Sequence, residues 1–419
     1  MSMQMRGTHQ PLPARMADPP PDRMMINIGP QHPSTHGVLR VAAQIAGETI
    51  EKADCDIGYL HRGVEKLIES RLYYQGMVYT DRTDYTAAPA NNLGYLMAVE
   101  KLLGIEDQVP ERAHYLRMIV MELARIYGHM IWIGTHSLDM GAMSMFLYAF
   151  REREKISGLF EEGCGARLTT NYMRAGGVGR HDDPPGWLDH VEEFANGFTV
   201  EEFDTILTGN EIYQMRTQGV GIIEPEKAIS YGVTGPSLRG SGVDWDLRRN
   251  QPYARYDQID FEVPVFNGCD VWSRYLVRLN ELFQSRAIIL QSVERARELA
   301  GEPVNANNAN VVWPEIERVS GWEPAGMRGD MEAMINHFKL VIEGYSPPPG
   351  DTYFGVESPK GELGFYFVSD GSGVPYRCHI RSPSFVNLSS LSEMVEGELI
   401  ADLVACIGSI DIVLGEVDR

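Results

Sequence analysis

Apolar residues recur every three or four positions through the middle of this chain, and this spacing predicts a largely helical body. The helical pattern covers four segments: 91–105, 114–160, 189–207 and 271–301. The second segment is apolar on nearly every side at its centre, so we expect it to be buried among other helices. Gly141 interrupts that segment and predicts a bend or a break. Together the four segments predict a central helical bundle.

Shorter apolar runs on both sides of this body predict β-structure. Between Met25 and about Ile68 the chain mixes turn residues with alternating runs such as VLRVAAQIAGETI. After SPPPG at 346–350 it turns β-like again, in DTYFGVESPKGELGFYFVSDG and PYRCHIRSPSF. A Gly- and Pro-rich stretch at 231–265 predicts an ordered loop with short strands. A final helix and a short tail, IDIVLGEVDR, are expected at the end.

These patterns predict an α+β fold that is mainly helical and is organised in four parts. The parts are a tail, an N-terminal β-containing region, a helical core that holds the functional site, and a C-terminal α+β region: 1–24, 25–70, 71–340 and 341–419. The tail is rich in Met, Pro and Arg, which is typical of a segment that is disordered or draped over a partner.

Composition narrows the function classes. The formal net charge of -21 argues against general nucleic-acid binding, which needs a basic surface. No apolar run approaches the roughly 18–20 residues of a membrane-spanning helix. We therefore expect any membrane contact to be peripheral or to be made through partners.

The five cysteines are isolated along the chain, and no two of them form a CxxC pair. This spacing favours free thiols in a reducing compartment and lacks the usual ligand pattern of an iron–sulfur cluster or a structural zinc. The sequence also lacks a glycine-rich dinucleotide loop in a useful context, a phosphate-binding P-loop, a GxSxG elbow and an HExxH motif. The chain therefore does not resemble a binder of NADH, FMN or ATP.

A histidine pair in GPQHPSTHGVLR is the first candidate for chemistry. His32 and His36 have the HxxxH spacing that aligns two metal ligands on a helix, but Pro33 and Gly37 favour a turn. In a turn, these histidines either bond backbone groups in a purely structural role or present an imidazole that titrates near neutral pH.

Tyr85 and Asp139 are the other candidates. Tyr85, in DRTDYTAAP, has a hydroxyl that can donate to a carbonyl oxygen; the alternative is a core tyrosine with a satisfied hydroxyl. Asp139 follows His136 at i,i+3 within a nearly apolar helix, so its carboxylate needs a partner. The alternative for Asp139 is a capping or helix-breaking role beside Gly141.

At these same places the chain resembles the D-subunit family of NADH:quinone oxidoreductase, or respiratory complex I. The matching motifs follow the family's order between about residue 25 and residue 419: GPQHPSTHGVLR, GYLHRGVEKL, DRTDY, AVEKLLG, ELARI, GTHSLDMGAM, GVTGP, SGVDWDLR, SPKGELGFY and GEVDR. The resemblance implies a peripheral subunit on the cytoplasmic face of a bacterial inner membrane. It also implies quinone reduction coupled to proton translocation.

The family is similar in fold to the large subunit of nickel–iron hydrogenases, which holds its metals with two CxxC pairs. The positions of those pairs are occupied here by other residues: Asp84 and Ala87 early, Val413 and Glu416 late. The resemblance therefore implies a pocket without nickel or iron, in which the quinone headgroup sits. It further implies that His36 and Tyr85 hydrogen-bond the two quinone carbonyl oxygens and that Asp139 pairs with His36.

The resemblance also implies partners and cofactors outside this chain. Electrons are expected from an iron–sulfur cluster in the B-type subunit, which is similar to the hydrogenase small subunit. FMN and further clusters are expected on other subunits, and contacts are expected with the C-type subunit and the H-type membrane subunit. Arg62, in GYLHRG, matches an arginine close to the cluster of the B-type subunit. Many relatives carry a histidine near that cluster, at or beside the position where this chain has Thr169. The absence of that histidine predicts that the reduction potential of the cluster depends less on pH.

Two alternatives remain open from the sequence. One is a hydrogenase-like large subunit, which the absent cysteine pairs disfavour. The other is a non-catalytic scaffold of a related membrane oxidoreductase.

Overall fold

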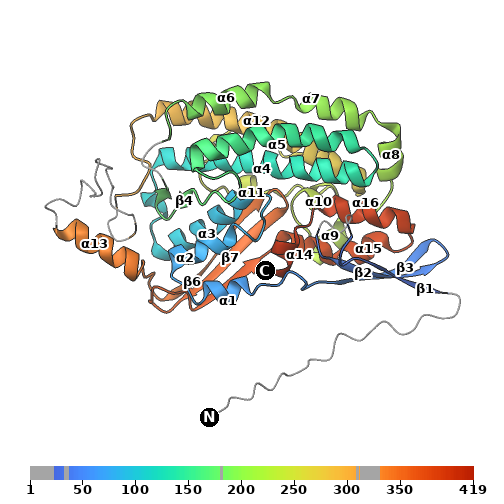
Figure 1. Ribbon diagram of the computed structural model, residues 1–419, viewed down its shortest axis with the longest axis horizontal. Helices are drawn as coiled ribbons and strands as arrows, with labels where there is room; N and C mark the ends of the chain where they lie inside the picture. The colour runs from blue at the N-terminus through green and yellow to red at the C-terminus, as the bar shows by residue number, and fades with distance from the viewer. Residues whose placement is uncertain (1–22, 33–36, 180–182, 308–310, 312–330) are drawn as a thin grey trace, which may run out of the picture.

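The computed structural model describes residues 23–32, 37–179, 183–307, 311 and 331–419. Long helices stacked side by side form the upper layer of the molecule in Figure 1. They are α4, α5, α6 and α12: Glu111–Asp139, Met143–Cys164, Trp187–Gly197 and Val271–Glu298. The predicted helical bundle is thus confirmed. Gly141, with a φ of 90°, breaks the long apolar segment into α4 and α5.

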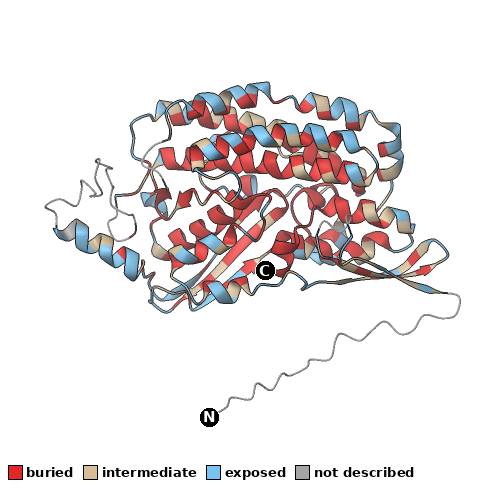
Figure 2. Cartoon of the chain, in the orientation of Figure 1, coloured by how far each residue is buried: buried red, intermediate tan, exposed pale blue. Residues whose placement is uncertain are grey.

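Helix α4 is the centre of this bundle. Almost every side chain between Arg112 and Met130 is buried, and Figure 2 shows α4 buried along most of its length. Its neighbours α5 and α12 pack against it, and α5 keeps most of its charged residues on the outside. An all-round apolar helix needs partners on several sides, and this requirement explains its central place.

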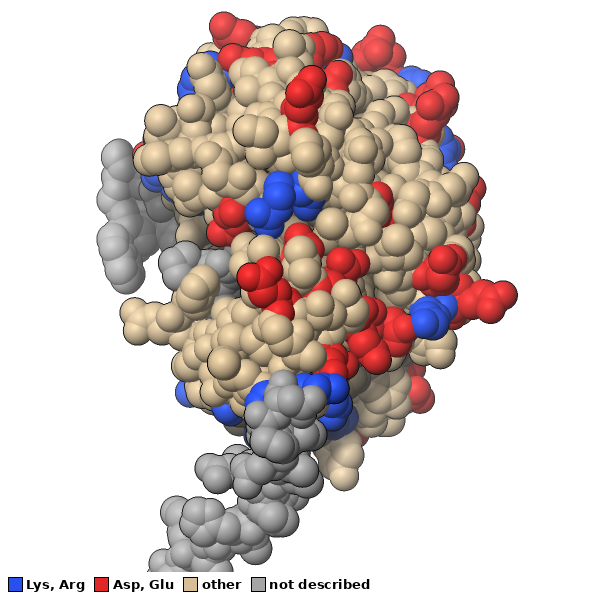
Figure 3. Space-filling model, turned by 90° about the vertical axis from the view of Figure 1, so that its right-hand side faces the viewer, with Lys and Arg blue, Asp and Glu red and all other residues tan. Residues whose placement is uncertain are grey.

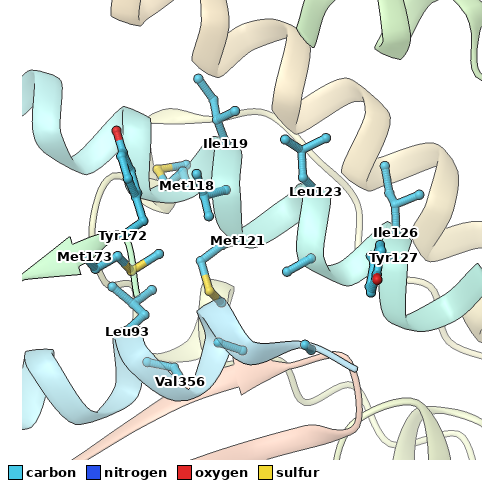
Figure 4. Packing of buried hydrophobic residues seen from close by; sticks show 14 of the residues in the cluster. Leu93, Met118, Ile119, Met121, Leu123, Ile126, Tyr127, Tyr172, Met173 and Val356 are labelled. Carbon is cyan, nitrogen blue, oxygen red and sulfur yellow. The ribbon is translucent and has the colours of Figure 1, made fainter. Parts of the chain in front are cut away.

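A second layer lies below the bundle. Here the helices α2 and α3 (Tyr73–Thr80 and Ala88–Leu103) pack beside an antiparallel sheet. The sheet has the order β6–β7–β8, at Gly350–Ser358, Gly361–Ser369 and Arg377–Arg381. Gly94 lets α3 approach the sheet closely, because a Cβ there would lie 3.1 Å from both Phe365 and Val356. Leu93, Met118, Met121 and Val356 join the bundle and this layer in one continuous core (Figure 4).

The N-terminal β-region is confirmed as a three-stranded antiparallel sheet, β1–β2–β3, at Met24–Ile28, Arg40–Ala46 and Thr49–Asp56. Alternate residues of β2 are buried. Strand β3 packs on α15, and both belong to a second core cluster with α16 (Leu391–Val395 and Ile400–Ile410). The same region also contains a short helix, α1 (Val64–Ile68), which the pattern did not predict.

Three expectations were wrong in detail. The helix expected at 189–207 is broken at Phe198, which has extended backbone angles, and continues as α7 and η3 (Val200–Phe203 and Asp204–Thr208). The Gly- and Pro-rich stretch holds short helices, α10, α11 and η4, where short strands were expected (Pro236–Arg239, Leu247–Asn250 and Tyr256–Gln258). The expected tail contains a buried helix, α17 (Leu414–Asp418).

The other described elements complete the fold. They are η2, β4, β5, α8, α9, α13 and α14: Glu106–Gln108, Met173–Arg174, Gly177–Val178, Glu211–Thr217, Pro225–Tyr231, Met331–Ile342 and Pro383–Ser389. The observed architecture confirms a mainly helical α+β fold. Among the described helices, none is both long and apolar enough to cross a bilayer.

A network of charged side chains is buried where the two layers meet. It joins α4, α12, the loops around 239–248 and the end of β6 through Arg125, Arg239, Arg248, Glu122, Asp246, Glu281 and Glu357. Arg125 also donates to the backbone oxygens of Glu357 and Ser358 at 2.6 and 3.1 Å. Because an unpaired buried charge is costly, these pairs fix the end of β6 against the bundle.

Figure 3 shows the end of the molecule that carries α8, where uncharged side chains cover most of the surface and acidic groups are scattered over it. Ile212 and Met215 on α8 are 69% and 81% exposed. Large apolar side chains in such positions are typical of surfaces that contact a partner.

Two glycines of α5 test the packing of the bundle. A Cβ at Gly163 would lie 2.4 Å from Trp187, so Gly163→Ala should lower the free energy of unfolding by about 1–3 kcal/mol. Gly158 faces open space, so Gly158→Ala should raise it by about 0.5–1 kcal/mol through helix propensity. Denaturant unfolding of the purified chain measures both, and equal effects would contradict this packing.

Candidate functional site

Tyr85 lies in the loop between α2 and α3, against the backbone of α17. A Cβ built on Gly415 would lie 3.4 Å from Cε1 of Tyr85 and 2.7 Å from the backbone oxygen of Thr83. Glycine at this position therefore allows the two segments, far apart in the sequence, to meet. The Tyr85 side chain is 39% exposed, so one part is packed and another part faces outward.

A buried lysine stands beside this loop. Lys360, in the turn between β6 and β7, is 1% exposed. Its Nζ donates to Oγ1 of Thr86 at 2.8 Å and lies 3.2 Å from Asp84 and 3.5 Å from Asp411. Burial alone lowers the pKa of Lys360, but Asp411, Asp84 and Glu416 together raise it above its ordinary value. Lys360 therefore carries a full positive charge at the centre of three carboxyl groups.

Glu416 on α17 is the third of these carboxyl groups. It accepts a hydrogen bond from the Ser384 hydroxyl, and its other oxygen, Oε1, has no hydrogen-bond partner in the described part of the chain. Burial and the nearby Asp84 carboxylate raise the pKa of Glu416 to about 7, against the opposing effects of Ser384 and Lys360. Glu416 therefore keeps its proton to a higher pH than an exposed glutamate does.

The same surroundings act on Tyr85. Burial and the Asp84 carboxylate raise the pKa of its hydroxyl, while Lys360 lowers it. Because the net direction is upward, the phenol keeps its proton at neutral pH and is a hydrogen-bond donor. Lys360 would stabilise a phenolate if the proton were given away.

His36 lies outside the described residues, so its predicted role stays a prediction. The residues on either side of its loop are placed: His32 and Gly37 form an isolated antiparallel bridge. A Cβ on Gly37 would lie 3.4 Å from the Leu414 side chain. Gly37, the residue after His36, thus lies against Leu414 of α17. The next residue of α17 is Gly415, which contacts Tyr85.

Asp139 is the last residue of α4 and is half-buried. The preceding His136 is fully buried; its ring stacks on Trp132, with centroids 5.2 Å apart. A Cβ on Gly408 of α16 would lie 2.5 Å from Nδ1 of His136, so this histidine fills a tight interior position. His136 is therefore a packing residue, and the pairing of Asp139 with His36 stays a prediction.

Arg62 and Thr169, predicted to lie near a partner's cluster, belong to segments that approach the C-terminal end of α2. Arg62 is exposed, and its guanidinium donates to the backbone oxygen of Arg82 at 2.5 Å. Thr169 is half-buried in the segment that brings Asn171 to Asp81. Both segments therefore adjoin the loop that carries Tyr85.

Two of the four positions at which the hydrogenase resemblance places cysteines act on the same side chain. Asp84, from the early pair, and Glu416, from the late pair, both act on Lys360. Lys360 and Asp411 were not identified as site residues from the sequence. The available signal was a lysine in SPKGELGFY, a charged residue between two strongly apolar β-segments. Among the described residues, no three or more His, Cys, Asp or Glu side chains are grouped to hold a metal ion.

Comparison with known proteins identifies the family of the chain. Residues 139–419 match the family described as respiratory-chain NADH dehydrogenase, 49 Kd subunit. The D subunit of the NADH-quinone oxidoreductase of Geotalea uraniireducens (strain Rf4) is 52% identical over 398 residues, covering 94% of this chain and 98% of that protein. A D subunit of Koribacter versatilis (strain Ellin345), numbered 2 in its name, is 50% identical over 401 residues, covering 94% and 96%.

These matches define a subunit of a respiratory oxidoreductase complex. The chain belongs to the 49 Kd subunit family of the respiratory-chain NADH dehydrogenase, whose bacterial relatives are named as D subunits of NADH-quinone oxidoreductase.

Lys360 can be tested by removing its charge. Lys360→Met should lower the free energy of unfolding at neutral pH by about 3–5 kcal/mol, because the buried carboxylates lose the cation that neutralises them. The loss should shrink as the pH falls and Glu416 takes up its proton. Lys66→Met is the control: the Lys66 side chain is 81% exposed, and its removal should cost less than about 0.5 kcal/mol. Equal effects of the two substitutions in denaturant unfolding would contradict a buried ionic role for Lys360.

Proposed function

We propose that this chain lines the quinone-reduction site of a membrane-associated NADH:quinone oxidoreductase and takes part in quinone reduction coupled to proton translocation. The observation that carries the proposal is the setting of Tyr85. Its phenol is partly exposed and is influenced by the buried Asp84 and Lys360, and Lys360 in turn is influenced by the buried Glu416. These residues lie where the family's early and late motifs meet.

Quinone reduction takes two electrons and two protons, and each carbonyl oxygen gains negative charge before it gains a proton. A donor placed at such an oxygen stabilises the developing charge. The Tyr85 hydroxyl suits this role because burial holds its pKa above the ordinary value, so the proton is present at neutral pH. Lys360 then favours the phenolate that remains after transfer.

His36 is proposed as the donor to the second carbonyl oxygen, with Asp139 as its carboxylate partner. A carboxylate beside an imidazole favours the protonated ring, which can hold a proton until the quinone is reduced. This part of the proposal is supported by the position of Gly37 on Leu414, next to Gly415 and the Tyr85 ring.

The assignment also includes partners and location. We place the chain at the cytoplasmic face of the bacterial inner membrane, as a peripheral protein in contact with the B-type, C-type and H-type subunits. The chain itself is proposed to bind neither metal nor flavin, and the iron–sulfur clusters and FMN belong to its partners. Exposed apolar side chains support such assembly, among them Met215 on α8 and Phe338 on α13, at 81% and 63% exposure.

Tyr85→Phe tests the proposed donor. It removes one hydroxyl and keeps the ring against Gly415, so the assembled complex should reduce a soluble benzoquinone about 100-fold more slowly, in the range expected for loss of one positioned acid. Tyr376→Phe is the control, because that ring is 70% exposed at the surface. NADH-driven quinone reduction measures both variants, and the cluster signals should be unchanged. An unaltered rate in Tyr85→Phe would end this assignment.

A photoreactive ubiquinone analogue separates catalysis from scaffolding. If the chain lines the quinone site, mass spectrometry of the labelled complex should find the probe on peptides containing His36 and Tyr85. Excess unlabelled quinone should suppress that labelling. Labelling confined to the partner proteins would favour a non-catalytic scaffold.

A further inference from the structure

The buried group behind Tyr85 holds three carboxyl groups against two cations, Lys360 and the Arg278 of α12 that acts on Asp411. Lys360 faces Asp84 and Asp411 at 3.2 and 3.5 Å, and Glu416 adds a third carboxyl group that acts on the same cation. Glu416 is 0% exposed and Asp84 is 1% exposed, so water does not screen their repulsion. The arrangement is most stable when one of the three carboxyl groups carries a proton.

The contacts of each acid indicate which one carries it. Oδ1 of Asp84 accepts bonds from the backbone and hydroxyl of Thr86, at 3.0 and 2.6 Å. The Oδ2 atoms of Asp84 and Asp411 have no hydrogen-bond partner among the described residues, but each lies beside the Lys360 cation, at 3.2 and 3.5 Å. Glu416 has the Ser384 donors on one oxygen, while Oε1 is buried without a hydrogen-bond partner among the described residues. Burying an oxygen without a hydrogen bond costs much more free energy in a charged carboxylate than in a neutral carboxylic acid.

We propose that Glu416 is the proton reserve for Tyr85, which means that it returns a proton to Tyr85 after Tyr85 has donated its own. Lys360 is the positioning residue, because its charge stabilises the Glu416 carboxylate that remains. This proposal rests on the proposed quinone site. When the quinone oxygen takes the Tyr85 proton, the O–H bond of the phenol breaks and a phenolate remains. The Glu416 O–H bond then breaks, the phenol is restored, and the new carboxylate is held by Lys360. The two electrons enter the quinone from the reduced iron–sulfur partner.

The position of Glu416 fits this role. It follows Gly415, whose backbone lies against the Tyr85 ring. The charged or titratable groups that act on it come from three other segments: Asp84 in the α2–α3 loop, Lys360 in the β6–β7 turn, and Asp411 through Lys360. On α14 it contacts Ser384, a neutral donor that favours the carboxylate form. Tyr85 and Glu416 therefore share the electrostatic influence of Asp84 and Lys360.

Glu416→Gln is the direct test in the assembled complex. Glutamine has the shape of the protonated acid and can still accept from Ser384, so a purely structural role would leave activity intact. A proton reserve predicts at least a roughly tenfold lower rate of NADH-driven reduction of a soluble benzoquinone. The wild-type rate should fall as the pH rises through about 7, where Glu416 loses its proton, and this alkaline limb should be absent in the variant.

Ser384→Ala gives a second readout that does not remove the acid. The Ser384 hydroxyl lowers the pKa of Glu416, so its loss should move the alkaline limb to higher pH while the rate at a pH of about 6 stays near that of the wild type. An unshifted limb in Ser384→Ala, or a wild-type rate and pH profile in Glu416→Gln, would overturn the reserve. If those tests fail but Tyr85→Phe is impaired in the same preparation, the proposed quinone site is kept and only the role of Glu416 is rejected. If Tyr85→Phe is normal, both assignments fail.

Discussion

The constraint on which this structure depends is the anchoring of a buried hairpin turn between two sets of charges. Glu357, at the end of β6, is paired with Arg239, and Arg125 holds the adjacent backbone oxygens. Three residues further on, Lys360 is paired with Asp84 on the other side of the turn. Hairpin turns usually lie at the surface, but here the whole turn from Glu357 to Gly361 is buried. The ionic network of the bundle therefore fixes the position of the cation in the site.

This arrangement explains how a pocket that the family resemblance describes as emptied of metal ligands can stay polar. A metal centre carries concentrated positive charge and needs anionic ligands. In this chain the positive charge comes from Lys360, and carboxyl groups stand where the resemblance places two of the lost thiolates, at Asp84 and Glu416. In the quinone site that we propose, exchangeable protons take the place of a metal in the charge balance, and such a site can supply protons to a reduced carbonyl compound.

The hydrophobic pattern was sufficient for the body of the fold, because α4 and α12 are long enough for their periodicity to be unambiguous. It failed where local and tertiary forces compete. Phe198 breaks the helix expected at 189–207 as its ring joins the core, and the glycine-rich stretch forms helical turns held by buried arginines such as Arg239. The C-terminal tail was predicted wrongly because α17, with five residues, is too short to leave a periodic pattern, yet it is buried between distant segments.

The candidate site was predictable only in part, for a related physical reason. Tyr85 could be proposed from its motif, but the partnership of Lys360 with Asp84 joins positions far apart in the chain and leaves no local trace. The buried turn has a further consequence for natural variation. Surface hairpins readily gain or lose residues during evolution, whereas one insertion between Glu357 and Lys360 would misalign the charges on both sides at once. We expect this turn to keep its length across homologues even where its neighbours drift.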